Sequence, residues 1–330
     1  MPKKPLDDRI RDSPRPPAPP IHRSHWGWLV VAYFFLGGIA GGAQVIAALA
    51  ALVGGKKSAG VARLARYVSF AAFLPCPPLL ILDLGRPERF LHMLRVVKLR
   101  SPMSVGSWTL VAFGGVAALA TLDQAAADHI LPRGMLTRRR GWWSPLTAVT
   151  GLPLGLGLAG YTGVLLAATA VPLWTKRGLL LGPLFLASAL STAAAAIDAT
   201  AIATGQRHRG WVPLRRFERL TLLAETLLMV AWLGRLGRAV LPLASGPLAL
   251  WVHHGVAGLG LAVPAVLGAL APHLPPKLRI TASAVALSST LVGGFVLRWA
   301  LVVGGNRSAD DAGATFEMTA RPSTERKQGS

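Results

Sequence analysis

Two tyrosines, one aspartate and one arginine are side chains of this sequence that could do chemistry in apolar surroundings. Tyr33 and Tyr161 fall inside long apolar runs, where a hydroxyl group seeks a hydrogen-bond partner. Asp83 closes another such run, and Arg86 follows three residues later. A carboxyl group at an apolar boundary can accept protons near neutral pH. Asp83 is therefore a candidate proton acceptor, unless Arg86 holds it ionised and the two form a structural clamp.

Two further acids, Asp198 and Glu225, lie inside consecutive apolar runs. Ionisable groups inside a bilayer are costly, so each one calls for a functional hypothesis. Because consecutive spanning helices are antiparallel, we expect both acids at similar depth, where they could pass or share a proton. The alternative is a polar pair that only fixes helix packing.

Membrane-spanning helices must position these residues. The protein has 330 residues, is 52% hydrophobic and 15% charged, and has a mean hydropathy of +0.47. That composition is typical of an all-α polytopic membrane protein and too apolar for a soluble one of this length. A spanning helix needs about 20 apolar residues. Eight runs qualify, at residues 27–53, 61–82, 103–122, 146–171, 179–204, 220–241, 248–271 and 280–303.

Proline and glycine patterns add detail to two of these runs. The second run contains the sequence Pro-Cys-Pro-Pro at residues 75–78, which must break or sharply kink a helix. Irregular backbone at membrane depth survives only where protein or a cavity covers it, so we expect the second helix to be buried or to line a pocket. Glycines at residues 37–42 predict close helix contacts in the first run.

Charge and cysteine content exclude several classes of protein. The formal net charge is +21, but Lys and Arg lie almost wholly between the apolar runs and in the tails, where they can meet anionic lipid head groups. No basic stripe interleaves with aromatic residues as stacking on nucleic-acid bases requires. Cys76 is the single cysteine, so the protein itself is not expected to hold an iron–sulfur cluster or other metal.

The histidines argue against haem. Of the eight, His253 and His254 alone enter an apolar run, and adjacent side chains on one helix cannot both ligate one iron. We therefore expect no haem in this protein.

Four short motifs carry a resemblance to a known family. Residues 83–90, Asp-Leu-Gly-Arg-Pro-Glu-Arg-Phe, and 101–108, Ser-Pro-Met-Ser-Val-Gly-Ser-Trp, resemble the signature of the NrfD/polysulfide-reductase membrane subunits. Residues 38–42, and residues 161–166 followed by 171–174, also match that pattern. The motifs cover helices one to four, and the similarity from helix five onward is looser.

The resemblance implies an architecture and a function. Family members are built as two four-helix bundles, which here correspond to residues 26–174 and 175–304. The first bundle would bind menaquinone or ubiquinone near one face of the bacterial inner membrane. It would exchange electrons with a ferredoxin-like iron–sulfur subunit that leads to a molybdopterin catalytic subunit, so the protein would be inert alone. The polar tails, 1–25 and 305–330, are expected to be disordered.

The resemblance also assigns roles to residues. Tyr161 matches the family tyrosine that hydrogen-bonds a quinone carbonyl. Where some members place a histidine on the quinone, this sequence has Tyr33, and the neighbouring asparagine of those members is replaced by Val30. Asp83, Arg86 and Ser104 complete the expected quinone site.

Other residues are expected to move protons or to bind the partner. The proton-transfer groups would be Asp83, Asp198 and Glu225. The surface that docks the extrinsic subunit would consist of Glu88, Arg89, Arg95, Lys98 and Arg100, with lipid head-group contact as the alternative. Ser104 and Ser107 are expected to cap the third helix.

Two other functions remain open. A broken helix and intramembrane acids also suit a transporter, although the inverted repeat typical of many transporters is not visible in the sequence. The protein could instead be a purely structural membrane anchor.

Overall fold

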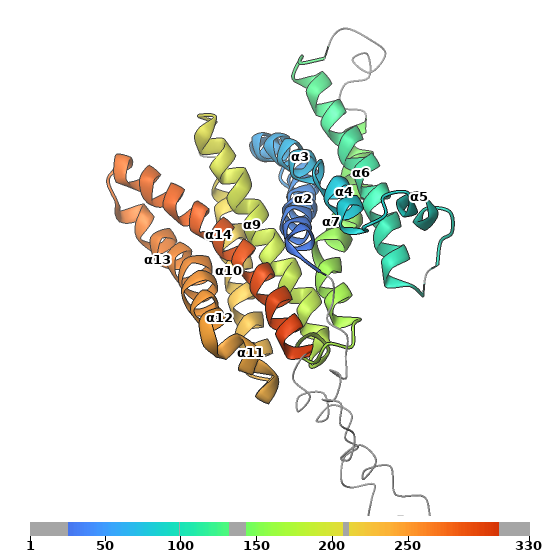
Figure 1. The fold of residues 1–330 in the computed structure, drawn as a ribbon. Helices are drawn as coiled ribbons and strands as arrows, with labels where there is room; N and C mark the ends of the chain where they lie inside the picture. Colours follow the sequence, from blue (N-terminus) through green and yellow to red (C-terminus); the bar gives the residue numbers. More distant parts are fainter. Residues whose placement is uncertain (1–25, 99, 132–142, 207–210, 310–330) are drawn as a thin grey trace, which may run out of the picture.

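The computed structural model describes residues 26–98, 100–131, 143–206 and 211–309. Helices account for nearly all of these residues, and none of them forms a strand. The long helices lie side by side, with α13 and α14 at one edge and α6 at the other (Figure 1). The expectation of an all-α polytopic membrane protein is therefore confirmed.

The first half of the sequence supplies α2 (Trp28–Leu52), α3 (Ala59–Phe73), α4 (Cys76–Asp83), α5 (Arg89–Met93), α6 (Pro102–Ala127), α7 (Trp143–Ala167) and α8 (Pro172–Thr175). The second half supplies α9 (Leu181–Ala203), α10 (Val212–Leu233), α11 (Leu241–Ala244), α12 (Gly246–Leu250), the π-helix η6 (Trp251–Ala262), α13 (Val263–Leu270) and α14 (Pro276–Ala309). Short 3-10 turns η1 (Lys56–Ser58), η3 (Gly178–Leu180), η5 (Gly237–Val240) and η7 (Ala271–His273) join some of them.

The proline cluster breaks the second helix as expected. The segment α3 ends at Phe73, and α4 begins at Cys76 after a two-residue turn. Cys76 is fully buried, and its Sγ donates to the carbonyl of Ala72. Only one side of this turn is covered by protein, at Phe73 and Cys76, whereas Leu74 is 56% exposed.

Helix α2 is the centre of the packing, because its glycines allow neighbouring backbones to approach. It contacts α3, α7, α9 and α14. A Cβ atom at Gly41 would lie 2.7 Å from the carbonyl oxygen of Gly155 in α7, and one at Gly42 would lie 2.6 Å from that of Ala189 in α9. The glycines predicted to allow close helix contacts therefore do so against two neighbours, α7 and α9.

Seven described helices or helix pairs are long and apolar enough to cross a membrane, so the count of eight is not confirmed. The element left out is α10, which carries five charged side chains: Arg215, Arg216, Glu218, Arg219 and Glu225. Its exposed face is nevertheless apolar at residues 220, 223, 227 and 230. An apolar exposed face is what lipid contact requires, and an eighth crossing by α10 remains a prediction.

Two predicted boundaries were wrong. The sixth run was placed at 220–241, but α10 starts eight residues earlier, where Pro213 occupies the first turn and suits a helix start. The last helix continues through residues 305–309, which were expected to be disordered, because Ser308 is buried and accepts a hydrogen bond from the amide of Leu173. The predicted disorder of 1–25 and 310–330 concerns residues outside those described.

The division into two bundles remains a proposal. Helices α2, α3, α6 and α7 contact one another, as do α9, α10, α13 and α14. However, α2 packs against α9 and α14 as well, and α7 packs against α9. The two groups therefore share an extensive interface.

Candidate functional site

A cavity of about 130 Å³ lies where α2, α4, α6 and α7 meet. Three residues expected at the site, Tyr33, Asp83 and Tyr161, line it. The remaining wall consists of Trp26, Val30, Leu80, Leu84, Phe90, Met93, Met103, Gly106, Ser107, Leu110 and Leu165. The structure thus gathers two tyrosine hydroxyl groups and one carboxyl group within a largely apolar wall.

Tyr33 is a buried donor aimed at this cavity. Its side chain is only 3% exposed, and it lies beside Cys76 and Gly37. Within the described residues, its hydroxyl group makes no hydrogen bond, although a buried tyrosine normally finds a partner. The hydroxyl of Tyr33 is therefore available to a ligand.

Tyr161 reaches the cavity from α7, and unlike that of Tyr33 its hydroxyl group already has a hydrogen-bond partner. Its hydroxyl donates a hydrogen bond to the backbone carbonyl of Pro102, at the start of α6. A Cβ atom at Gly106 would overlap the Tyr161 hydroxyl, so the absence of a side chain at Gly106 leaves room for this ring. With its proton directed at Pro102, the Tyr161 oxygen offers lone pairs to a ligand that donates.

Asp83 lies at the end of α4 and is half-buried. Arg86 is exposed and does not line the cavity. The two side chains, both within the described part of the protein, form no ion pair. The clamp alternative therefore has no support from this geometry, and the carboxyl group of Asp83 faces the cavity without a cationic partner.

Ser104 was expected in the site but lies outside the cavity. Its Oγ accepts from the amide of Lys98 at 3.0 Å and donates to the carbonyl of Val96, so it fastens the preceding loop to α6. The helix cap was also misplaced, because Ser101 accepts from the amide of Ser104 at 3.5 Å and Ser107 is a full turn further on. Ser107 is the serine that lines the cavity.

Several wall residues were not foreseen as part of the site. Trp26 is one of them: it lines the cavity and stacks on Trp174 with ring centroids 5.3 Å apart. Met103 is 60% exposed at the rim, beside the cavity wall. Only the arrangement of α4 and α6 in space reveals these neighbours, although the motif at 101–108 already contained Met103 and Gly106.

The predicted docking residues lie on the adjoining loop. Glu88, Arg95, Lys98 and Arg100 are all exposed, and the loop includes the short helix α5, which projects beyond α6 (Figure 1). The side chain of Arg89 is not among those described. Such a charged, exposed loop beside the cavity could contact a protein or lipid head groups.

The two acids of the second half are both buried but do not lie at one level. Glu225 accepts from the hydroxyl of Ser191 at 2.6 Å. Asp198 is seven residues further along α9, about 10 Å at 1.5 Å per residue, and borders a small cavity with Glu218 and Arg219. Equal depth was therefore a wrong expectation, because α10 begins at Val212, earlier than expected, so Glu225 lies deeper along its helix than Asp198 does along α9.

Sequence reasoning overlooked Arg298, a fully buried cation in α14. Its Nη1 donates to Ser188 Oγ at 3.1 Å and to the carbonyl of Gly294 at 2.7 Å, and the charge of Glu225 acts on it. Its Nη2 has no partner among the described residues. The available signal was a lone arginine in the middle of the run 280–303.

A second polar cluster closes the opposite end of the first four helices. Asp128, just after α6, accepts from Arg63 Nε and Tyr67 Oη, both at 2.7 Å, and from Gln124 Nε2 at 3.0 Å. Burial alone would raise the pKa of Asp128, but these hydrogen bonds together hold the pKa below its usual range. The carboxylate is thus fixed in its ionised form and holds α3 against the end of α6.

The fold and the cavity define a polytopic α-helical membrane protein with a small amphiphilic cavity near one end of its helices. Among the described residues, no group of three His, Cys, Asp or Glu side chains could hold a metal ion.

The protein belongs to the NrfD family. The family described as "Polysulphide reductase, NrfD" matches residues 20–308. The sequence is also 27% identical over 309 residues to the C subunit of polysulfide reductase from Wolinella succinogenes, a match that covers 85% of this protein and 94% of that subunit. The resemblance inferred from the motifs is thereby confirmed, and it supports a membrane subunit of a reductase complex.

Proposed function

We propose that the protein is the quinone-reactive subunit of a respiratory oxidoreductase complex, with menaquinone or ubiquinone bound in the cavity between Tyr33, Asp83 and Tyr161. The observation that carries the proposal is the convergence of these three polar groups from three helices on one apolar cavity. A quinone needs such a place, because its ring is apolar and its two oxygen atoms are polar.

The cavity has room for about one ring, so it fits the single-ring head group of ubiquinone more closely than the fused two-ring head group of menaquinone. An apolar cavity of about 150 Å³ accommodates benzene, and this one has about 130 Å³. The exposed side chains Leu91, at 68%, and Met103, at 60%, offer apolar contacts beside the rim where a long tail would leave. The site therefore suits the head group of a lipid-soluble molecule.

The two tyrosines would have different roles. Tyr33 has a free hydroxyl that can donate to a carbonyl oxygen. Tyr161, which already donates to Pro102, can accept from a hydroxyl group. Together they would hold the two ends of a ring and distinguish the reduced from the oxidised form.

Asp83 would accept the protons. A bound quinol supplies two electrons and two protons when it is oxidised. Asp83 lies at the edge of the cavity and is half-exposed, so its carboxyl group can take a proton inside and pass it to water.

The electrons would go to a partner subunit. This protein has one cysteine and so lacks the thiolates that bind iron–sulfur clusters. The exposed loop with Glu88, Arg95, Lys98 and Arg100 lies beside the cavity and would bind a ferredoxin-like subunit, which leads to a molybdopterin catalytic subunit. Localisation in a bacterial inner membrane belongs to the same proposal.

A proton path through the second half is a separate part of the proposal. Asp198 borders a cavity among polar side chains, and Glu225 with Ser191 lies deeper, next to the charge of Arg298. Asp198 and Glu225 would then conduct protons inward from the membrane face opposite the quinone site. Loss of proton pumping in Glu225→Gln, with quinol oxidation retained, would support this path.

The central test uses the assembled complex and a short-chain quinol. Asp83→Asn should lower the oxidation rate about 100-fold, as expected for a proton acceptor, while Asp83→Glu should retain much of it. Tyr161→Phe should weaken binding of a quinone-site inhibitor about tenfold. Arg86→Gln serves as the control, because Arg86 is exposed outside the cavity.

Each rival function has its own outcome. If inhibitor binding is unchanged in both Tyr161→Phe and Asp83→Asn, the cavity is not the quinone site. Absence of any quinone binding would leave a purely structural anchor. Uptake of a solute by vesicles that contain this protein alone would favour a transporter.

A further inference from the structure

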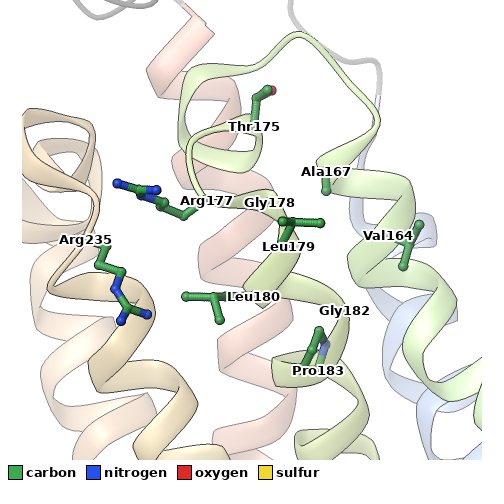
Figure 2. Close-up of a pocket in the computed structure, with 10 residues that line it drawn as sticks. All are labelled: Val164, Ala167, Thr175, Arg177, Gly178, Leu179, Leu180, Gly182, Pro183 and Arg235. Carbon is green, nitrogen blue, oxygen red and sulfur yellow. The ribbon is translucent and has the colours of Figure 1, made fainter.

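A cavity much larger than the candidate quinone site is on the outer flank of the helices and has no part in the proposed quinone site. It measures about 810 Å³ and lies between the end of α7, the start of α9 and the segment after α10 (Figure 2). Its walls combine two guanidinium groups with apolar side chains.

The charge of this cavity is uniformly positive. Arg177 and Arg235 line it, and neither guanidinium group makes a hydrogen bond or an ion pair within the described residues. No acidic residue is part of the lining. Both arginines extend on one flank of the cavity, opposite Val164 and Ala167 (Figure 2). An anionic group would neutralise two positive charges that have no internal partner.

Arg177 is held at this place by an unusual backbone conformation. Its φ of 64° lies in the left-handed region, which residues other than glycine rarely adopt. Such a conformation persists only where the surroundings fix it, and it is found preferentially at ligand-binding positions. Arg177, which has this conformation, is one of the residues that line the cavity.

Apart from Thr175, the remaining lining is apolar and belongs to α7, η3 and α9. Leu179 is 95% exposed, and Leu180, Val164 and Pro183 continue the surface along α7 and α9. A leucine so exposed at the end of a membrane-spanning helix contacts lipid. A cationic end above an apolar wall matches an amphiphile with an anionic head and acyl chains.

We propose that this cavity is a binding site for one anionic phospholipid, whose phosphate lies between Arg177 and Arg235 and whose acyl chains lie along Leu179 and Val164. Arginine suits this role because its planar guanidinium group can make two hydrogen bonds to a phosphate. The lipid would fill the gap between α7 and the segment after α10, and so would link the two helix groups from outside.

The test is native mass spectrometry of the full-length protein in a neutral detergent, titrated with phosphatidylglycerol or with phosphatidylcholine of the same acyl composition. The wild type should retain one phosphatidylglycerol in preference to phosphatidylcholine. Arg177→Ala combined with Arg235→Ala should weaken phosphatidylglycerol binding about 30-fold, since each basic residue near a membrane surface contributes about fivefold.

Two further variants locate the site. Lys56→Ala combined with Lys57→Ala removes the same charge from exposed positions in η1, at the opposite end of the helices, and should leave binding unchanged. Leu179→Gln should weaken binding of the lipid without altering binding of inorganic phosphate. Equal losses in the two double variants would overturn the proposal, because the attraction would then be general.

Other occupants give distinct results, each of which would also overturn the proposal. Inorganic phosphate that binds as tightly as the lipid would identify a free-anion site. Lipid binding that appears only after residues 310–330 are removed would show that this tail occupies the cavity. Loss of an extrinsic subunit from the complex, with lipid binding unchanged in the double arginine variant, would identify a protein contact.

Discussion

The Nε atom of Arg298 donates a hydrogen bond to the backbone carbonyl of Phe34, 3.1 Å away, although 264 residues separate the two in the sequence. This contact joins the last helix to the first. Phe34 follows directly after Tyr33, so the buried cation supports the part of α2 that lines the candidate quinone site. Phe35 and Phe185 flank the guanidinium group with ring centroids 5.8 and 5.7 Å from its carbon atom.

Replacement of Arg298 by methionine should destabilise the protein by about 3–5 kcal/mol, because it removes three buried hydrogen bonds, to the carbonyls of Phe34 and Gly294 and to Ser188, and also the positive charge that acts on Glu225. Thermal unfolding can be followed with a thiol-reactive dye, since Cys76 is the single cysteine and is fully buried. The double variant Arg298→Met with Glu225→Gln should recover part of the loss. If the double variant unfolds at no higher temperature than Arg298→Met alone, the two charges are not coupled.

The Gly106→Ala substitution should weaken binding of a short-chain quinone about tenfold, the worth of roughly one hydrogen bond. The added methyl group would overlap the hydroxyl end of Tyr161 and push that ring away from Pro102 and the cavity. Binding can be measured by quenching of tryptophan fluorescence, because Trp26 lines the cavity.

Gly115→Ala is the matched control for this substitution. Gly115 belongs to the same helix, α6, and a Cβ atom there would meet nothing within 4 Å. Alanine also favours helix formation over glycine, so neither variant should unfold the helix. Equal quinone affinities in the two variants would contradict a role for the Gly106–Tyr161 contact.

The sequence was sufficient to predict the helical architecture and part of the site. Apolar runs report spans directly, and the prolines at 75–78 predicted the break between α3 and α4. Tyr33, Asp83 and Tyr161 could be grouped because helix direction places each of them near the same membrane face. Their meeting in one cavity follows from that simple geometry.

Other features depended on the rotation of each helix about its axis and on the depth of each residue in the membrane. A pattern of apolar residues does not encode either. Asp198 and Glu225 were placed at one level because their runs were compared by approximate boundaries, and the run for α10 began eight residues too late. Ser104 was assigned to the site by its motif, but it points to the preceding loop. Arg298 was missed because its partners, Phe34 and Ser188, come from distant helices.

Charge reversal on the exposed loop should weaken assembly with the extrinsic subunit. Arg95→Glu combined with Lys98→Glu changes two exposed side chains and should slow association about tenfold at low salt, an effect that added salt should reduce. The measurement is the association rate of the purified iron–sulfur subunit with the membrane subunit. Lys56→Glu combined with Lys57→Glu is the control at the opposite end, and equal slowing there would contradict a docking surface on the loop.

The contacts of Asp128 should make stability depend on pH in acid solution. Its pKa is lowered in the folded protein by hydrogen bonds from Arg63, Tyr67 and Gln124, against the opposing effect of burial. A group with a lowered folded pKa stabilises the protein above its unfolded pKa, about 3.9 for Asp, and this contribution is lost as the pH falls through the folded value. We therefore expect the difference in Tm between the wild type and Asp128→Asn to be full at pH 6 to 7 and to shrink steadily below about pH 4. Comparison with Asp128→Asn removes the effect of other acids, which titrate in both proteins. A difference that stays constant between pH 7 and pH 3 would show that the ionised carboxylate does not hold α3 and α6 together.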